Sequence, residues 1–297
     1  MSAERPAAAG PGAGGAPAPA GTGVAGAARI AAAFATARGE GRAALMPYMM
    51  GGFPDPEGSL RVAAAYADAG ADLIELGVPF SDPLADGPVI HAAATAALDA
   101  GTDIGSVLEV CRSVSDRVPV VLMAYTNMVL GGSGPEDFGR RASEAGAAGV
   151  IVPDLPFGED ESIRQALTDC GLAVVPLIAP TTLGERRAEI CEVASGFVYV
   201  VSTVGTTGER GELPPDLREL VDDVRSRADV PVAVGFGIAT PGQASEVGQS
   251  ADGVIIGSRL VRMIADADDL SAGLEAVAGF LAESAAAMAG DGSRPVR

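Results

Sequence analysis

Two acidic side chains, Glu75 and Asp86, are the best candidates in this chain for catalytic chemistry. Glu75 lies inside an apolar run, where an ionised carboxylate is costly unless it faces a cavity and is used. Asp86 lies in the segment that follows, which is too long and too rich in proline for a minimal connection between a strand and a helix. A buried carboxylic acid of this kind is a candidate for proton transfer.

Both residues also have a purely structural interpretation. Glu75 could be a surface carboxylate at the end of a strand. Asp86 precedes Gly87 and Asp82 precedes Pro83, and aspartates in such positions commonly hydrogen-bond to their own turn. The sequence alone leaves these alternatives open.

Three glycine-containing segments further along the chain resemble a phosphate-binding site. They are Gly205 to Gly208, Gly235 to Gly237, and Gly257 with Ser258. Glycine allows backbone N–H groups to approach an oxyanion closely, and a helix that begins at Ser258 directs its positive end to the same point. We expect the three segments to follow the last three strands of a barrel, where phosphate sites are common.

The composition excludes several mechanisms. All 20 cationic side chains are arginine, so no lysine is available to form a Schiff base. The only histidine is His91, and the three cysteines are widely spaced, which argues against a zinc site and favours reduced thiols in the cytoplasm. A net charge of −19 makes nucleic acid and anionic membranes unlikely partners.

Eight β-rich runs alternate with helical stretches, a rhythm typical of parallel α/β folds. The runs are 45–50, 72–76, 119–124, 149–152, 173–178, 197–201, 232–234 and 253–256. Most are continuously apolar, as expected for strands buried on both faces. Helices are expected at 57–69, 104–115, 135–145, 159–169, 184–194, 215–227, 240–248 and 270–288.

This pattern predicts a (β/α)8 TIM barrel with its active site at the carboxyl ends of the strands. An open doubly wound sheet is the alternative, but no G-x-G-x-x-G motif follows the first strand. We expect a disordered Ala/Gly/Pro-rich tail over 1–28, one catalytic domain over 29–290 and a C-terminal tail over 291–297. An extra N-terminal helix is expected from about Gly26 to Arg38. No signal peptide and no uncharged run long enough to span a membrane is apparent in the sequence.

Over residues 43–288 the chain resembles the tryptophan synthase α subunit family. The segment ELGVPFSDPLADGP, which contains both Glu75 and Asp86, is highly specific to that family. Four further motifs occur in the same order: GGFPDP, PDLP with Asp154, GFVYVVS and GFGI. The resemblance implies cleavage of indole-3-glycerol phosphate into indole and glyceraldehyde 3-phosphate.

The resemblance also implies the roles of individual residues. Glu75 would be the general acid/base, and Asp86 would hold the indole N–H. The expected substrate-binding residues are Tyr48, Met123, Tyr125 and Tyr199 around the indole and glycerol, Thr207 in a lid over 203–213, and Gly208, Gly237, Gly257 and Ser258 at the phosphate. A retro-aldol cleavage without lysine or metal needs an electron sink in the substrate, and an indole protonated at C3 supplies one.

Two residues depart from the family pattern. Thr206 stands where the family usually has valine, and His91 where it commonly has glutamine. For His91, which is expected at the start of a helix beyond the loop, a surface or partner-side position is favoured over a catalytic one.

The resemblance further implies a partner, the tryptophan synthase β subunit, in an α2β2 assembly. That subunit would carry the pyridoxal phosphate, and this chain would bind no cofactor and no metal. The partner surface would include Pro79–Asp82 and the loop with Asn127. Two alternatives stay open: a free-standing indole-3-glycerol-phosphate lyase that releases indole, and a non-catalytic subunit that only activates its partner.

Overall fold

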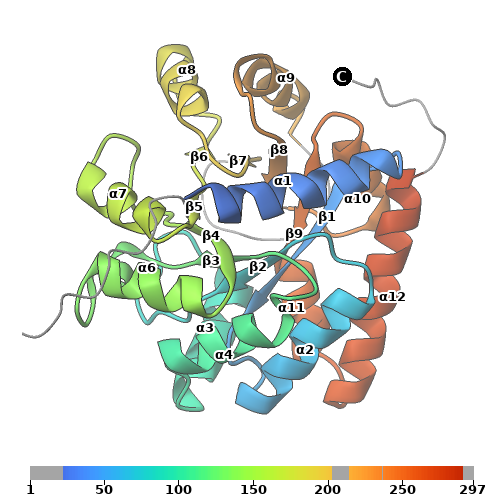
Figure 1. Cartoon of the computed structure of the whole chain (residues 1–297). Helices are drawn as coiled ribbons and strands as arrows, with labels where there is room; N and C mark the ends of the chain where they lie inside the picture. Colours follow the sequence, from blue (N-terminus) through green and yellow to red (C-terminus); the bar gives the residue numbers. More distant parts are fainter. Residues whose placement is uncertain (1–22, 203–213, 236, 290–297) are drawn as a thin grey trace, which may run out of the picture.

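Nine short parallel strands form one sheet in which strand order follows chain order. The computed structural model describes residues 23–202, 214–235 and 237–289 (Figure 1). The order across the sheet is β5-β4-β3-β2-β1-β9-β8-β7-β6. The strands are β1 (Ala44–Met50), β2 (Ile74–Gly77), β3 (Val120–Met123), β4 (Ala147–Ile151), β5 (Ala173–Val174), β6 (Leu177–Ile178), β7 (Val198–Val201), β8 (Val232–Gly235) and β9 (Gly253–Ile256).

The strands β5 and β6 are the two halves of the strand expected over 173–178. The N–H of Val175 donates to the carbonyl of Val150 at 2.9 Å, on the β4 side, whereas the carbonyl of Pro176 accepts from the N–H of Tyr199 at 3.0 Å, on the β7 side. The two ends of the sheet are therefore joined through one continuous segment, and the ring closes. Pro176 has no N–H to donate, which accounts for the split. The expected (β/α)8 barrel is confirmed. In an open doubly wound sheet, the alternative, the order of strands across the sheet would differ from their order along the chain.

Helices connect and surround the strands (Figure 1). Those that match the predicted ranges are α1 (Gly23–Gly39), α2 (Pro56–Asp68), α4 (Ile104–Val114), α6 (Pro135–Glu144), α7 (Glu161–Asp169), α8 (Gly184–Glu192), α9 (Leu217–Arg227), α10 (Pro241–Gly248), α11 (Ser258–Ala265) and α12 (Leu270–Ala289). Two more were not placed in the predicted series, α3 (Pro88–Asp99) and α5 (Thr126–Leu130). Helix α1 begins at Gly23, so residues 23–28, assigned above to the tail, are helical.

Alternation along the strands separates two apolar layers. In β1, Met46 and Tyr48 belong to the cluster inside the barrel, whereas Leu45 and Met49 belong to the layer between strands and helices. In β2, Ile74 and Leu76 both belong to the outer layer. The side chain between them must therefore point into the barrel, and that side chain is Glu75.

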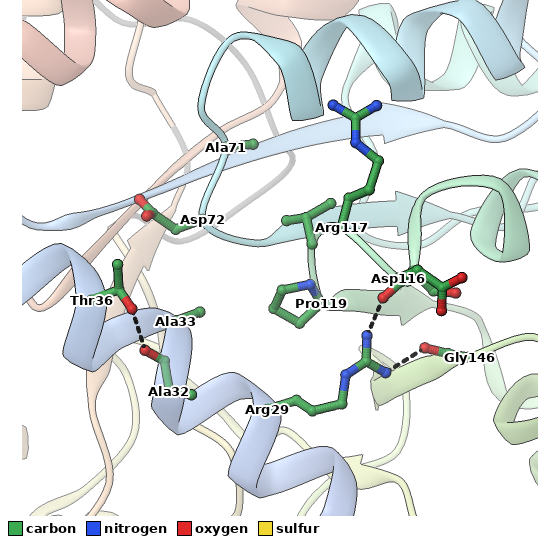
Figure 2. Close-up of a pocket in the computed structure, with 12 residues that line it drawn as sticks. Arg29, Ala32, Ala33, Thr36, Ala71, Asp72, Asp116, Arg117, Pro119 and Gly146 are labelled. Atoms are coloured by element: carbon green, nitrogen blue, oxygen red, sulfur yellow. Dashed lines mark hydrogen bonds between the residues drawn. The ribbon is translucent and has the colours of Figure 1, made fainter.

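Helix α1 covers the amino ends of the strands. Its Arg29 donates to the carbonyl oxygens of Ser115 and Gly146, from Nη1 to the latter at 2.8 Å. Figure 2 shows this side chain reaching from α1 across a groove of about 540 Å³. Because its guanidinium bonds to two carbonyls near strand starts, Arg29 ties α1 to the base of the barrel.

Helix α12 is the one described helix long and apolar enough to cross a membrane, although it carries Glu275 and Glu283. It packs against α2, α10 and α11, and Val277 and Leu281 on it are fully buried. These contacts place α12 in the outer layer of helices, with its apolar face packed against the rest of the barrel.

Several sequence-based expectations lie outside the described residues. They concern the tail over 1–22, the lid over 203–213 with Thr206, Thr207 and Gly208, and the C-terminal tail over 291–297.

Candidate active site

Glu75 is buried inside the barrel near its carboxyl end. Its side chain is only 2% exposed, and its Oε2 atom has no hydrogen-bond partner among the described residues. Its neighbours in register are Tyr48 on β1 and Val121 on β3, both of the inner cluster. Burial, with a contribution from the charge of Asp86, raises the pKa of Glu75 to about 8. Glu75 therefore carries a proton at neutral pH and is placed as a general acid.

Asp86 lies on the loop between β2 and α3 and is half-buried. Burial raises the pKa of its carboxyl group, and a hydrogen bond from Tyr125 and the nearby charge of His91 partly offset this effect. The two carboxyl groups lie close enough for the charge of Asp86 to raise the pKa of Glu75. The structure thus brings both predicted catalytic residues to one site.

Two tyrosines occupy the barrel interior beside Glu75. Tyr48 and Tyr199 are both almost fully buried, and the pKa of each is raised, mainly by burial and also by the charge of Glu75. Each hydroxyl lies over a glycine on the next strand: a Cβ at Gly77 would be 2.2 Å from the Tyr48 hydroxyl, and one at Gly235 would be 2.1 Å from that of Tyr199. Any larger residue at these two positions would displace the tyrosine.

Met123 is the last residue of β3, and Tyr125 lies just beyond the end of that strand. Met123 belongs to the inner cluster and is 9% exposed, whereas Tyr125 is 3% exposed. The Tyr125 hydroxyl accepts a hydrogen bond from the N–H of Ala85 at 3.1 Å, and its ring packs against Phe80 at a centroid distance of 5.3 Å. Tyr125 is thus a fixed point for the loop that carries Asp86.

The described part of the expected phosphate site lies at the ends of the neighbouring strands β8 and β9. Gly237 has a φ of 88°, a conformation that favours glycine. Gly257 precedes α11 as its N-cap, and Ser258, the first residue of that helix, is 8% exposed. The start of α11, with the positive end of its helix dipole, suits an anion.

His91 is exposed on the first turn of α3. The surface position expected for it is therefore present, but its charge also lowers the pKa of Asp86. Its role is electrostatic and secondary in this arrangement.

Asp154 and Thr126 are two polar residues of the site region for which no role was expected from the sequence. Asp154 Oδ1 accepts from the backbone N–H of Thr126 at 2.8 Å and from its hydroxyl at 2.9 Å. The available signals were the PDLP motif that contains Asp154 and its position just after the fourth strand of the barrel. Within the described ranges, no group of three or more His, Cys, Asp or Glu residues could hold a metal ion.

The site can exchange a proton at Glu75, hold a donor at Asp86 and bind an anion at the start of α11. It has no lysine to form an imine with a carbonyl substrate. A carbon–carbon cleavage at this site therefore does not proceed through an imine with a lysine of this chain.

Comparison with known proteins identifies the family of this chain. The family model described as "Tryptophan synthase alpha chain" matches residues 34–289. The tryptophan synthase alpha chains of Prochlorococcus marinus (strain MIT 9313) and Methanopyrus kandleri are each 46% identical, over 81% and 82% of this chain and 88% and 89% of their own lengths.

Solved structures give the same picture. A structure of Mycobacterium tuberculosis tryptophan synthase superposes with a TM-score of 0.80 at 37% identity, covering 88% of this chain and 98% of the other. A tryptophan synthase subunit alpha from Legionella pneumophila superposes with a TM-score of 0.79 at 33% identity, with the same coverage.

Proposed function

The chain belongs to the tryptophan synthase alpha chain family, and we propose that it cleaves indole-3-glycerol phosphate by a retro-aldol reaction. Members of this family are soluble catalytic subunits of tryptophan biosynthesis. The products are indole and glyceraldehyde 3-phosphate, so the chain acts as a carbon–carbon lyase. The observation that carries the proposal is the buried carboxyl of Glu75, which has an unpartnered oxygen and a pKa raised to about 8, beside Asp86.

The reaction needs a proton at C3 of the indole before the carbon–carbon bond can break. Glu75 is protonated at neutral pH and supplies that proton. Protonation makes the ring cationic, and the carboxylate of Asp86 stabilises this charge while it accepts the indole N–H. The charge develops in a half-buried region, where electrostatic stabilisation is larger than in water.

The second step breaks the bond between C3 and the glycerol carbon. The glycerol hydroxyl on that carbon loses its proton to the Glu75 carboxylate and becomes the aldehyde carbonyl. The electron pair of the broken bond returns to the indole ring and neutralises it. Glu75 thus ends the cycle protonated as it began, so the step balances without a metal or a cofactor in this chain.

The other residues orient the substrate. Tyr48, Met123 and Tyr125 surround the indole, and Tyr199 lies against the glycerol part. The phosphate binds at Gly237, Gly257 and Ser258, together with Gly208. Thr207, on the lid, contacts Asp86 when the site closes and water is excluded.

We also place this chain in an α2β2 assembly with a tryptophan synthase β subunit that holds pyridoxal phosphate, in the cytoplasm. Two exposed apolar side chains on the site loops support a partner there: Leu84, between β2 and α3, is 76% exposed, and Leu130, at the end of α5, is 47% exposed. Asn127 is also exposed on α5. Exposed apolar groups around an active-site mouth are typical of a contact surface.

The experiment is a direct assay of indole release from indole-3-glycerol phosphate, with and without an added β subunit. Slow release by the chain alone that rises strongly with the β subunit supports the proposal. Fast release that needs no partner instead supports the free-standing lyase. No release under either condition, together with activation of the β subunit, supports a non-catalytic activating subunit and overturns the proposal.

A further inference from the structure

A chain of hydrogen bonds links the loops after three consecutive strands, β4, β3 and β2. Asp154, after β4, bonds to Thr126 after β3. The residue before Thr126 is Tyr125, which bonds to Ala85 and Asp86 after β2. The network ends on the carboxyl group that the proposed function assigns to the indole N–H.

We propose that Asp154 is a positioning residue for Asp86, acting through Tyr125. This inference rests on the proposed function for the identity of the reaction, but its contacts are independent of it. Asp154 does not touch the substrate in this account. It fixes the segment from which the Tyr125 side chain reaches the loop of Asp86.

Asp154 anchors the start of α5. Tyr125 is the N-cap of α5, and its own side chain makes no capping bond to that helix. The Asp154 carboxylate takes over this function from another loop, with bonds to both the N–H and the hydroxyl of Thr126. A carboxylate in such a position stabilises the start of a helix and fixes its place. Helix α5 has only five residues, so it depends on an external anchor.

Tyr125 connects the anchored start of α5 to the loop between β2 and α3. The Tyr125 hydroxyl accepts from the N–H of Ala85 at 3.1 Å and donates to the carboxylate of the next residue, Asp86. The ring also packs on Phe80, earlier in the same loop. Tyr125 therefore holds the loop at three points, and a shift of its backbone changes all three contacts together.

The contact with Tyr125 affects the protonation of Asp86. The hydrogen bond from Tyr125 lowers the pKa of a carboxyl group that burial otherwise raises. Loosening Tyr125 therefore favours the protonated form of Asp86, which cannot accept the indole N–H with a charge. In a profile of kcat/KM against pH, the acid limb should therefore move to higher pH.

The test compares Asp154→Ala with Asp154→Asn in the full chain, assayed with its β subunit. We expect Asp154→Ala to lower kcat/KM about tenfold, as for the loss of one hydrogen bond to a charged group. Its acid limb should shift upward in the same direction as that of Tyr125→Phe. Asp154→Asn keeps an oxygen acceptor for Thr126 and should restore most of the activity and the wild-type limb. Combining Asp154→Ala with Tyr125→Phe should cost little more than Tyr125→Phe alone, because the two act in one network.

Asp103→Ala is the matched control. Asp103 caps α4 by the same pair of bonds, to the N–H of Ser106 at 2.9 Å and to its hydroxyl at 3.0 Å, but lies outside the site. This variant should lower the melting temperature as a lost cap does, with an unchanged pH profile. An unshifted limb in Asp154→Ala, or an equal shift in Asp103→Ala, would overturn the inference.

A second readout separates this inference from the proposed function. The Asp86 carboxyl group can be titrated by NMR in substrate-free protein carrying 13C-labelled aspartate. We expect a higher midpoint in Asp154→Ala than in the wild type. If the wild type releases no indole, the proposed function fails while this titration still decides the role of Asp154; an identical midpoint in the two proteins rejects that role.

Discussion

The two ends of the barrel treat their carboxylates in opposite ways. At the amino end, Asp72 pairs with Arg42, with 3.0 Å between Oδ1 and Nη2, and its other oxygen accepts from the N–H of Leu45 at 2.7 Å. Asp252 repeats the arrangement with Arg225 at 3.1 Å and the N–H of Val232 at 3.0 Å. At the carboxyl end, no ion pair reaches Glu75 or Asp86 among the described residues.

The amino end of the barrel contributes stability, and the carboxyl end carries the reactive groups. Each amino-end aspartate precedes a strand and bonds to the first N–H groups of the neighbouring strand, so it fixes the register as well as neutralising an arginine. At the carboxyl end, burial without a cation costs stability but leaves an acid that can exchange protons near neutral pH. Active sites in such barrels lie at this end.

Replacing Glu75 should give the largest effect. Glu75→Gln keeps the shape of the side chain and removes its exchangeable proton, so indole formation should fall by about a thousandfold or more, the scale of general acid–base catalysis. Activation of the β subunit should persist, because no contact of the fold is lost. Steady-state assays of both activities check this. Indole formation close to that of the wild type would remove Glu75 from the reaction.

The pH dependence of stability should be the next largest effect. The folded-state pKa of Glu75 is raised to about 8 from an ordinary value of 4.5. Its contribution to stability is therefore fully present below pH 4.5 and is lost as pH rises through 8. The free energy of unfolding of the wild type, relative to that of Glu75→Gln, should fall by roughly 4 kcal/mol between pH 4 and pH 9. Denaturant titrations measure the difference, and parallel curves for the two proteins would contradict it.

Breaking the amino-end pair should affect stability and leave catalysis intact. Asp72→Ala removes the buried one of the two carboxylate partners of Arg42, whose side chain is only 11% exposed, and leaves it with the exposed Glu40. The substitution also leaves the Leu45 N–H without its acceptor. We expect a loss of about 3 kcal/mol in the free energy of unfolding. The kcat/KM of the folded protein should not change. A loss of activity larger than the loss of folded protein would show that the two ends are not separable.

His91 should give the smallest effect. Its positive charge lowers the pKa of Asp86, but its side chain is exposed, so the interaction is screened. His91→Gln should raise the acid limb slightly and change kcat/KM at neutral pH by less than about threefold, equivalent to less than about 1 kcal/mol. A change as large as that of Asp154→Ala would make His91 a principal determinant of Asp86.

Much of the fold was predictable because its signals are local. Continuous apolar runs gave the strands, and the eightfold alternation gave the barrel. For α3 only a start near His91 was expected, because the helix follows a long irregular loop, and α5 was missed because it is too short for a periodic pattern. The split of the strand at Pro176 is visible only once both neighbouring strands are known.

The site was predictable only in part. An acidic residue between two outward-facing apolar residues had to point inward, so Glu75 followed from the pattern together with the fold. The bonds that join Asp154 to Thr126 and Tyr125 to Ala85 connect residues 28 and 40 positions apart. No local pattern encodes such pairs, because they depend on how the loops meet in space.

The most direct test of this account is a titration of the Glu75 carboxyl group in the folded wild-type protein, by NMR with 13C-labelled glutamate and Glu75→Gln for assignment. We predict a midpoint near pH 8, because the group is buried without a cation. A midpoint near 4.5, the ordinary value of a glutamate, would mean that this group is solvated or paired, and would contradict its role as the proton donor.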